Sequence, residues 1–205
     1  MLQHMQLSWH GQYTIKVVSK ETTLILDPSS RLKADILSFS NPSDPEMSNI
    51  SGATPETTII DTPGEYSLRH FTLHSIGWNT EDGTERNLQR WMIEDIVLLH
   101  VGALNRDLNE QELRELELVD IDVLFAPIGG GSGMTKEQAM KMITTIEPRI
   151  VVPIHYAVPG SSEKLDALKP FLEEMGVESS QPEKKLILRK SKLPQEDMQT
   201  VILAP

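Results

Sequence analysis

Hydrophobic and polar residues alternate in short stretches through the first hundred residues, a pattern that predicts β-strands rather than helices. Turn-forming residues such as Ser40–Pro45 separate these stretches, and Pro63–Tyr66 predicts a tight turn. The polar run Asn79–Arg86 predicts a loop, whereas Glu94-Asp95 predicts a hairpin turn. The predicted strands are Tyr13–Val18, Thr22–Leu26, Asp35–Phe39, Thr57–Ile60, Phe71–Ile76, Gln89–Ile93 and Ile96–His100.

Past residue 100 the pattern changes to an alternation of helices and strands. Asn109–Glu112 and Thr135–Gln138 have the spacing of a capping box, which is typical of the first turn of a helix. Residues Ser162–Met175 predict a third helix, with a kink at Pro170 and a C-terminal cap at Gly176. The second helix should bury a stripe made of Ala139, Met142, Ile143 and Ile146. The remaining predicted strands are Asp122–Pro127, Ile150–Ile154, Lys185–Leu188 and Thr200–Leu203.

This order of elements predicts a layered α/β protein. A strand-rich first half is followed by helix–strand alternation, and the chain has no internal repeat or low-complexity linker. We therefore expect one domain that spans residues 1–205. The periodicity does not fix the order of the strands within a sheet.

Composition and charge exclude several classes of partner. Lys and Arg total 19 and Asp and Glu total 30, which gives a formal net charge of −11. Such a chain is a poor binder of nucleic acid or of anionic membranes, because both depend on basic side chains. Cysteine is absent, which excludes disulfides and thiolate chemistry. Without a signal peptide or a long apolar run, we expect a cytoplasmic protein.

Two histidines at strand ends are the first candidates for chemistry. His100 closes one predicted strand, and His155 follows another in Pro153–Tyr156. Functional groups of α/β sheets gather outside the carboxyl ends of the strands, so both imidazoles could face one crevice. The alternative is that each only satisfies hydrogen bonds of a loop. His70 and His74, four apart in a predicted strand, lie too far apart to share a metal ion, at roughly 13 Å.

The glycine run Gly129–Gly133 comes just before a predicted helix. The amino end of a helix can hold an anion, so the run could cradle a phosphate. It lacks the Lys-Ser/Thr of a phosphate-binding loop and the spacing of a dinucleotide fingerprint. A plain turn is the alternative, since glycine is the commonest residue of turns.

Several short motifs, in order along the chain, resemble the metallo-β-lactamase superfamily. The similarity is to its short branch of zinc-dependent hydrolases, akin to L-ascorbate-6-phosphate lactonase. This resemblance implies an αββα four-layer sandwich, and family relatives suggest a homo-oligomer. The motifs are Leu24–Pro28, Ala34–Leu37, Pro63–Tyr66, His100–Gly102, Pro127–Gly130 and Pro153–Tyr156.

The metal-binding motif of that family is changed in this chain. The family has His-x-His-x-Asp-His after its third strand, and on this alignment the three His positions are Asn41, Ser43 and Glu46. The Asp of the motif becomes Pro45. A further family Asp, which follows His-hydrophobic-Gly and supplies a metal oxygen, is Ala103 here. The resemblance thus implies a site from which most metal ligands have been lost.

His155 is the one clear ligand match that remains. A hydrolytic zinc ion needs about three protein ligands and an open position for water. We therefore expect a protein without its dinuclear centre or hydrolase activity and with no cofactor, which binds a small molecule or a protein in a regulatory or scaffold role. The alternative is a metal-dependent lactonase or phosphoesterase with a rearranged mononuclear site. His155, Glu46 and Asp44 would then hold Zn²⁺, Mn²⁺ or Mg²⁺, with His100 as a possible addition.

Overall fold

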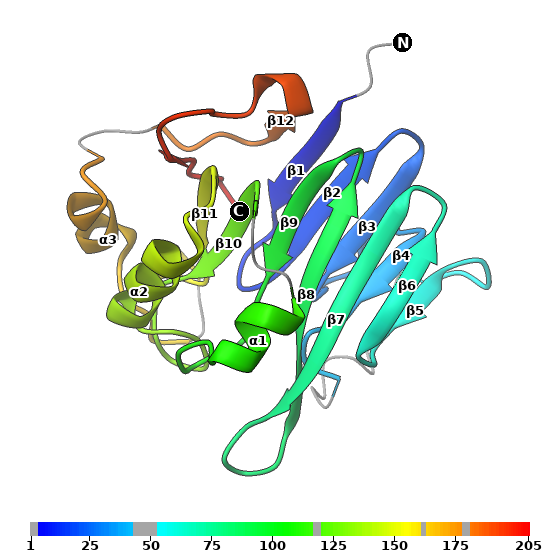
Figure 1. Ribbon diagram of the computed structural model, residues 1–205, viewed down its shortest axis with the longest axis horizontal. Coiled ribbons are helices and arrows are strands. Elements are labelled where there is room, and N and C mark those ends of the chain that lie inside the picture. Colours follow the sequence, from blue (N-terminus) through cyan, green and yellow to red (C-terminus); the bar gives the residue numbers. More distant parts are fainter. Residues whose placement is uncertain (1–3, 43–52, 117–119, 161–162, 178–180) are drawn as a thin grey trace.

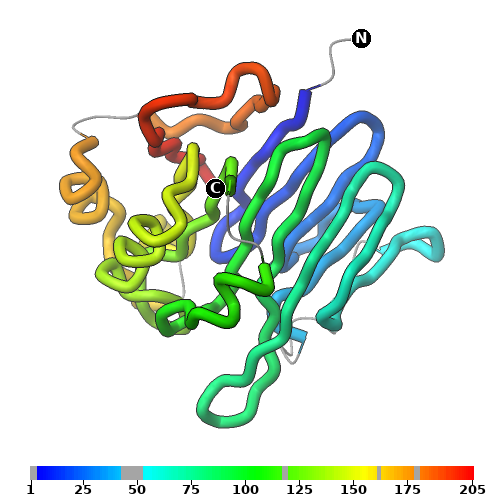
Figure 2. The backbone as a smooth tube through the Cα atoms, viewed as in Figure 1, coloured from blue at the N-terminus to red at the C-terminus, as the bar shows by residue number. Residues whose placement is uncertain are grey.

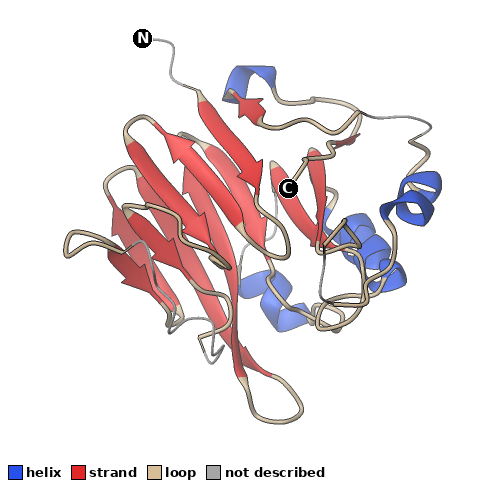
Figure 3. Cartoon of the chain, turned by 180° about the vertical axis from the view of Figure 1, so that it is seen from behind, coloured by secondary structure: helices blue, strands red, loops and turns tan. Residues whose placement is uncertain are grey.

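The computed structural model describes residues 4–42, 53–116, 120–160, 163–177 and 181–205. Two mixed β-sheets pack face to face, and the three α-helices lie on the side of the second sheet (Figure 1). Seen from behind, the helices gather beside one end of the strands (Figure 3). No helix in these residues is long and apolar enough to cross a membrane. The predicted α/β sandwich is confirmed as two mixed sheets with flanking helices.

The first sheet is built mainly from the N-terminal quarter of the chain. Its order is β12-β1-β2-β3-β4-β5, antiparallel from β12 to β3 and parallel from β3 to β5. Buried and half-buried residues alternate along β1 and β2, so one face of these strands points into the core. The strands are β1 (Met5–Trp9), β2 (Ile15–Ser19), β3 (Thr22–Leu26), β4 (Ile36–Ser38), β5 (Thr58–Ile60) and β12 (Leu186–Leu188).

The second sheet has an antiparallel part and a parallel part. Its order is β13-β11-β10-β9-β8-β7-β6, and the four strands from β13 to β9 run parallel. All residues of β9, β10 and β11 are buried, as expected for strands covered on both faces. The strands are β6 (Gly64–Leu68), β7 (Phe71–Asn79), β8 (Glu85–Ile93), β9 (Ile96–His100), β10 (Val123–Pro127), β11 (Ile150–Ile154) and β13 (Gln199–Thr200).

The helices begin where their capping residues predict. Both α1 (Glu110–Glu115) and α2 (Lys136–Ile146) start with a complete capping box, at Asn109 and Thr135. The predicted stripe of α2 is buried, and α2 contacts β10. A third helix, α3 (Leu168–Glu174), ends at Met175 and is followed by Gly176 with φ +70°.

One large hydrophobic cluster joins the two sheets. It includes Trp9 and Leu26 of the first sheet and Trp91 and Phe125 of the second, all fully or almost fully buried. A small second cluster of Ile25, Leu37 and Phe39 lies on the other face of the first sheet, against Leu32 and Ala34. This arrangement fixes the relative position of the two sheets, and with it the place where their strand ends meet.

Three local predictions were wrong. The loop predicted over residues 79–86 is shorter, because β7 and β8 continue to Asn79 and from Glu85 and form a hairpin that extends beyond the sheets (Figure 2). The third helix starts only at Leu168, so Pro170 lies in its first turn, where proline needs no kink. The tight turn predicted at Pro63–Tyr66 is instead the start of β6.

Candidate functional site

The carboxyl ends of the parallel strands place the predicted histidines at one edge of the second sheet. His100 is the last residue of β9, and His155 follows the last residue of β11. The register between β9, β10 and β11 confirms that these ends lie side by side. Both imidazoles are fully buried, and each is held by a different set of partners.

Both ring nitrogens of His155 have hydrogen-bond partners. Nε2 lies 3.2 Å from Oε2 of Glu163, and Nδ1 lies 3.2 Å from the hydroxyl of Tyr13. The Tyr13 ring stacks on the imidazole with 4.1 Å between the centroids, and its hydroxyl lies 3.0 Å from Oγ of Ser132. Because a carboxylate only accepts, we assign the Nε2 proton to the Glu163 contact, and Nδ1 then accepts from Tyr13.

Burial governs the protonation of this cluster. It lowers the pKa of His155 despite the opposing effect of Glu163, so the ring is neutral near pH 7. Burial also raises the pKa of Tyr13 well above its ordinary value, which keeps the hydroxyl protonated. For Glu163 burial acts against ionisation, but hydrogen bonds from Ser132 and the contact with His155 outweigh it and lower the pKa. The cluster is therefore one carboxylate that faces neutral donors.

Residues Gly129–Gly133 form a turn, one of the two alternatives that the sequence leaves open for this run. The backbone N–H of Ser132 donates to Oε1 of Glu163 at 3.0 Å, and other amides of the turn bond to carbonyls within it. A side chain at Gly131, where φ is +64°, would collide with the Glu163 carboxylate. The turn is thus already occupied by an anionic group of the protein itself, and a bound phosphate would be repelled.

His100 belongs to a second buried group centred on Asp27, at the end of β3 in the first sheet. Oδ2 of Asp27 lies 2.6 Å from Nε2 of His100 and accepts from Oγ of Ser40 at 2.5 Å. Oδ1 accepts from the backbone N–H of Ser40 at 2.6 Å. Gly102, at φ +53°, lets the chain pass so close to Ser40 that no side chain would fit. This group ties the two sheets together.

The changed metal-ligand positions fall into two groups. Oδ1 of Asn41 accepts a hydrogen bond from the guanidinium of Arg86, which enters from β8, and Ala103 is buried just after β9. The other positions, Ser43, Asp44, Pro45 and Glu46, lie outside the described residues. The structure therefore neither joins Asp44 and Glu46 to His155 nor separates them from it.

The described donor set does not fit a hydrolytic metal ion. No group of three or more His, Asp or Glu side chains in residues 4–42, 53–116, 120–160, 163–177 and 181–205 could hold one. His155 with Glu163 and His100 with Asp27 each form a pair, one ligand short of the usual three, and Nδ1 of His155 already faces the hydroxyl of Tyr13. Ala103 carries no donor atom.

Comparison with known proteins agrees with this fold. The sequence profile of the β-lactamase superfamily domain matches residues 6–155, more than half of the chain. The chain belongs to the β-lactamase superfamily. Among curated relatives, a UPF0173 metal-dependent hydrolase of Nanoarchaeum equitans is 42% identical over 64 residues, and a UPF0173 protein of Pyrococcus abyssi is 42% identical over 69 residues. These matches span 31% and 34% of the chain and only 30% and 31% of the relatives.

Solved structures resemble this chain over nearly its whole length. A proposed Zn-dependent hydrolase of the metallo-β-lactamase superfamily from Thermotoga maritima has a TM-score of 0.78 at 22% identity, and the match covers 97% of this chain and 98% of that one. A metallo hydrolase from Ignicoccus hospitalis has a TM-score of 0.67 at 16% identity, with coverage of 91% and 99%. At these identities the likeness concerns the fold.

Sequence reasoning missed several residues of the site. Tyr13, Arg86 and Glu163 contact the predicted positions, but none of them belongs to a motif that indicates such a contact. Asp27 did carry a signal, because an Asp-Pro pair that ends a hydrophobic strand places a carboxylate at the sheet edge. Only the fold brings these four side chains to His155, Asn41 and His100.

Proposed function

We propose that this member of the superfamily is a binding or scaffold protein that works without the dinuclear metal centre and without hydrolase activity. The observation that carries the proposal is the closed hydrogen bonding of His155, whose two ring nitrogens are engaged by Glu163 and Tyr13. A metal ion would have to displace one of them from a buried position. Asn41 is likewise engaged, by Arg86.

The same contacts link the two sheets, a structural role that a metal ion with ligands from both sheets could otherwise have. Tyr13 comes from the turn between β1 and β2 of the first sheet, and His155 comes from the end of β11 in the second. Asp27 and His100 make a second link between the sheets. Neutral and charge-assisted hydrogen bonds of this kind stabilise by about 1 to 3 kcal/mol each. A loss of metal ligands is thus compatible with a stable sandwich.

Metal analysis tests this proposal. The protein is purified without chelators and its zinc, manganese, iron and magnesium contents are measured per chain. We expect no stoichiometric ion. One or two tightly held zinc or manganese ions per chain would overturn the proposal, because ligand sets of two residues do not retain such ions through purification.

A second candidate is a metal-dependent hydrolase with a mononuclear site. It is favoured by the relatives, one of which is a metal-dependent hydrolase, and by the carboxylate of Glu163 beside His155. Asp44 and Glu46 would complete the ligand set with His155. Zinc, manganese or magnesium would then polarise the scissile group and lower the pKa of a water molecule.

Turnover measurements separate the two candidates. Phosphodiesters, phosphomonoesters and sugar lactones are assayed with added Zn²⁺, Mn²⁺ or Mg²⁺, in the wild type and in His155→Ala. The hydrolase candidate requires metal-dependent turnover that falls by at least about 100-fold in the variant, the effect of losing a metal ligand. His74→Ala, a half-buried histidine of β7, serves as the control. Absence of turnover supports the binding protein instead, whereas turnover that is equal in wild type and His155→Ala would reject both the His155 metal site and a protein without hydrolase activity.

A further inference from the structure

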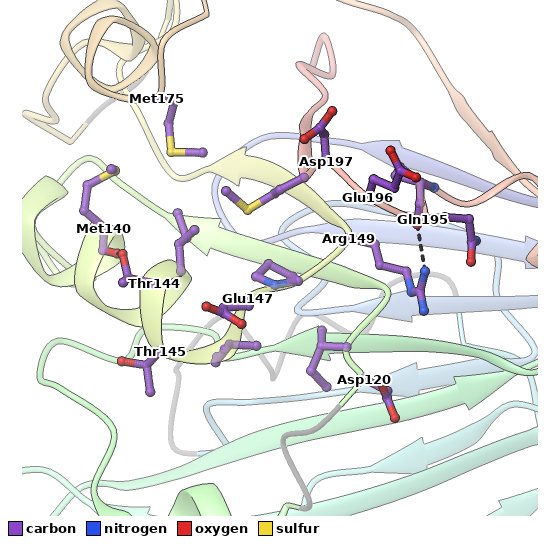
Figure 4. Close-up of a pocket in the computed structure, with 16 residues that line it drawn as sticks. Asp120, Met140, Thr144, Thr145, Glu147, Arg149, Met175, Gln195, Glu196 and Asp197 are labelled. Carbon is purple, nitrogen blue, oxygen red and sulfur yellow. Dashed lines mark hydrogen bonds between the residues drawn. The ribbon is translucent and has the colours of Figure 1, made fainter.

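A cavity of about 890 Å³ lies at the opposite end of the parallel strands from His155. Its lining comes from the last turns of α2, from Arg149 just before β11, from Met175 after α3, and from residues 194–198 (Figure 4). Arg149 and His155 are six residues apart on and around one strand, which is about 20 Å. The cavity is therefore separate from the candidate site above.

Methionine and isoleucine side chains form the hydrophobic part of the cavity lining. Met140 and Met175 pack against the core, Ile143 is buried, and Met198 is 43% exposed. Methionine side chains are flexible and polarisable, so they can fit the shape of different apolar ligands. A cavity of 300 to 1,000 Å³ is the usual size for a small organic molecule.

Negative charge surrounds this apolar lining. Asp120, Glu147, Glu196 and Asp197 all line the cavity, are exposed, and take part in no ion pair of the described residues. The carbonyl end of α2 points the same way, with no basic residue in its last turn. The negative potential at the carbonyl end of α2 adds to that of the four carboxylates.

The one basic side chain of the lining does not offset this charge. Arg149 lies 3.2 Å from Oδ1 of the buried Asp122 through Nε, and its NH1 donates to the carbonyl of Pro194 at 2.7 Å. Lys190 also contacts Asp122, at 2.7 Å. Arg149 and Lys190 share the single carboxylate of Asp122, so one net positive charge remains at the wall of the cavity against the four carboxylates of the lining.

We propose that this cavity binds an organic cation, an amine with an apolar body of about six carbons or more. The methionines and Ile143 would contact the apolar body, and the ammonium would lie among Glu147, Glu196 and Asp197. The size of the cavity favours a small molecule over a peptide helix, which needs a longer groove for anchors spread over two turns. This site does not depend on the function proposed for the His155 end.

Calorimetric titration with hexylammonium chloride tests the proposal on the full chain. Hexanoate has the opposite charge on an alkyl chain that is one carbon shorter, and methylammonium has the positive charge without the long alkyl chain. We expect hexylammonium to bind with a stoichiometry of one, and neither control ion to bind in the same concentration range. Raising the ionic strength should weaken binding, because the carboxylates are exposed.

Two variants locate the site. Glu147→Gln and Asp197→Asn should each weaken hexylammonium binding by about two- to five-fold, the effect of removing one solvent-exposed charge pair. Glu115→Gln, on the exposed side of α1, is the matched control and should bind as the wild type does. All three changes are at exposed positions, so each variant should fold.

Several results would overturn the proposal. These are no heat of binding with hexylammonium, equal binding of hexanoate, or an unchanged dissociation constant in both Glu147→Gln and Asp197→Asn. Binding of a basic amphipathic peptide without binding of hexylammonium would also reject a small-molecule site, and would assign the cavity to a protein partner. The metal content of the chain has no influence on any of these outcomes.

Discussion

The two ends of the parallel strands differ in how their polar side chains are paired. At the carboxyl ends, His155, His100, Asp27 and Asn41 are paired with other side chains of the protein. At the amino ends, the carboxylates around the cavity have no basic partner in the described residues. The described positions that align with the family's metal motif, Asn41, Ala103 and His155, lie at the first of these ends, whereas the unpaired carboxylates lie at the second.

This contrast agrees with the proposal that the metal site has been lost without loss of the fold. Each ligand position that no longer holds an ion needs a new partner for the buried polar groups around it. Arg86, Tyr13 and Glu163 supply those partners, and Ala103 removes the need for one. Most polar groups at this end are therefore paired within the described residues, although Nδ1 of His100 and Nε of Arg86 are buried without a hydrogen-bond partner.

The largest effect is expected for Asp27→Ala. The substitution removes an acceptor for His100 and for two donors of Ser40, and leaves these buried groups unpaired. We expect the free energy of unfolding to fall by about 3 to 5 kcal/mol in urea denaturation, as when one partner of a buried pair is deleted. Glu81→Ala, at an exposed position in the end of the β7–β8 hairpin, should leave stability nearly unchanged. Equal midpoints for the two variants would mean that the closed network does not hold the sheets together.

Gly102→Ala should have the next largest effect. Gly102 and Gly83 both have positive φ, so alanine has a similar conformational cost of about 1 kcal/mol at either position. Only at Gly102 would the new methyl group collide with Ser40, which is bonded to Asp27. We therefore expect Gly102→Ala to lower the free energy of unfolding by at least about 2 kcal/mol more than Gly83→Ala does. A difference close to zero would show that the packing around Ser40 can relax.

The ion pair of Glu112 and Arg106, away from both strand ends, is a reference for how much a paired carboxylate contributes to stability. Burial disfavours ionisation of Glu112, but hydrogen bonds from Arg106, at 2.5 and 2.9 Å, and from the backbone of Asn109 outweigh it and lower the pKa. Because the pKa is lower in the folded state, this pair stabilises the protein above the ordinary pKa of about 4.5 and less as the pH falls below it.

The pH dependence is measured by urea denaturation from pH 7 to pH 3. We expect Glu112→Gln to lose about 1 kcal/mol at pH 7 and to show a shallower fall in stability below pH 4.5 than the wild type. Glu110→Gln, whose contact with Arg114 is fully exposed, should keep the wild-type slope. A parallel pH profile for wild type and Glu112→Gln would refute the assigned pairing.

The smallest effect concerns the open end. Glu147 caps α2 at its carbonyl end, where a negative charge is unfavourable. Glu147→Lys should raise the free energy of unfolding by about 0.3 to 1 kcal/mol. The same substitution should weaken the binding of hexylammonium. A variant that is less stable than the wild type would mean that Glu147 has a structural partner, and the contrast between the two ends would weaken.

Much of the fold could be predicted from the sequence, because its signals are local. The capping boxes at Asn109 and Thr135 and the fully apolar strand Ile150–Ile154 depend on neighbours a few residues away. The hairpin of β7 and β8 was missed, since its polar tip strands are stabilised by pairing with each other and not by a buried face. The kink predicted at Pro170 was wrong, because the effect of a proline depends on where the helix begins.

The site was predictable only in part. His100 and His155 were identified because strand ends are visible in the sequence, and the positions Asn41 and Ala103 because they depart from a motif. Their partners Tyr13 and Glu163 lie 142 and 8 residues from His155 along the chain, and no local pattern marks them. The glycine run left a plain turn and an anion site as alternatives, and the sequence gives no local sign that Glu163 contacts this turn.

Anomalous X-ray scattering tests the central claim most directly. Crystals grown in the presence of Zn²⁺ and Mn²⁺ are measured at both absorption edges, and the difference maps are inspected at the imidazole of His155. The account predicts continuous contacts from His155 to Tyr13 and Glu163 and no anomalous peak bonded to the ring. A peak at coordination distance from His155, at about 2.0 to 2.2 Å, with further ligands from the chain, would contradict it.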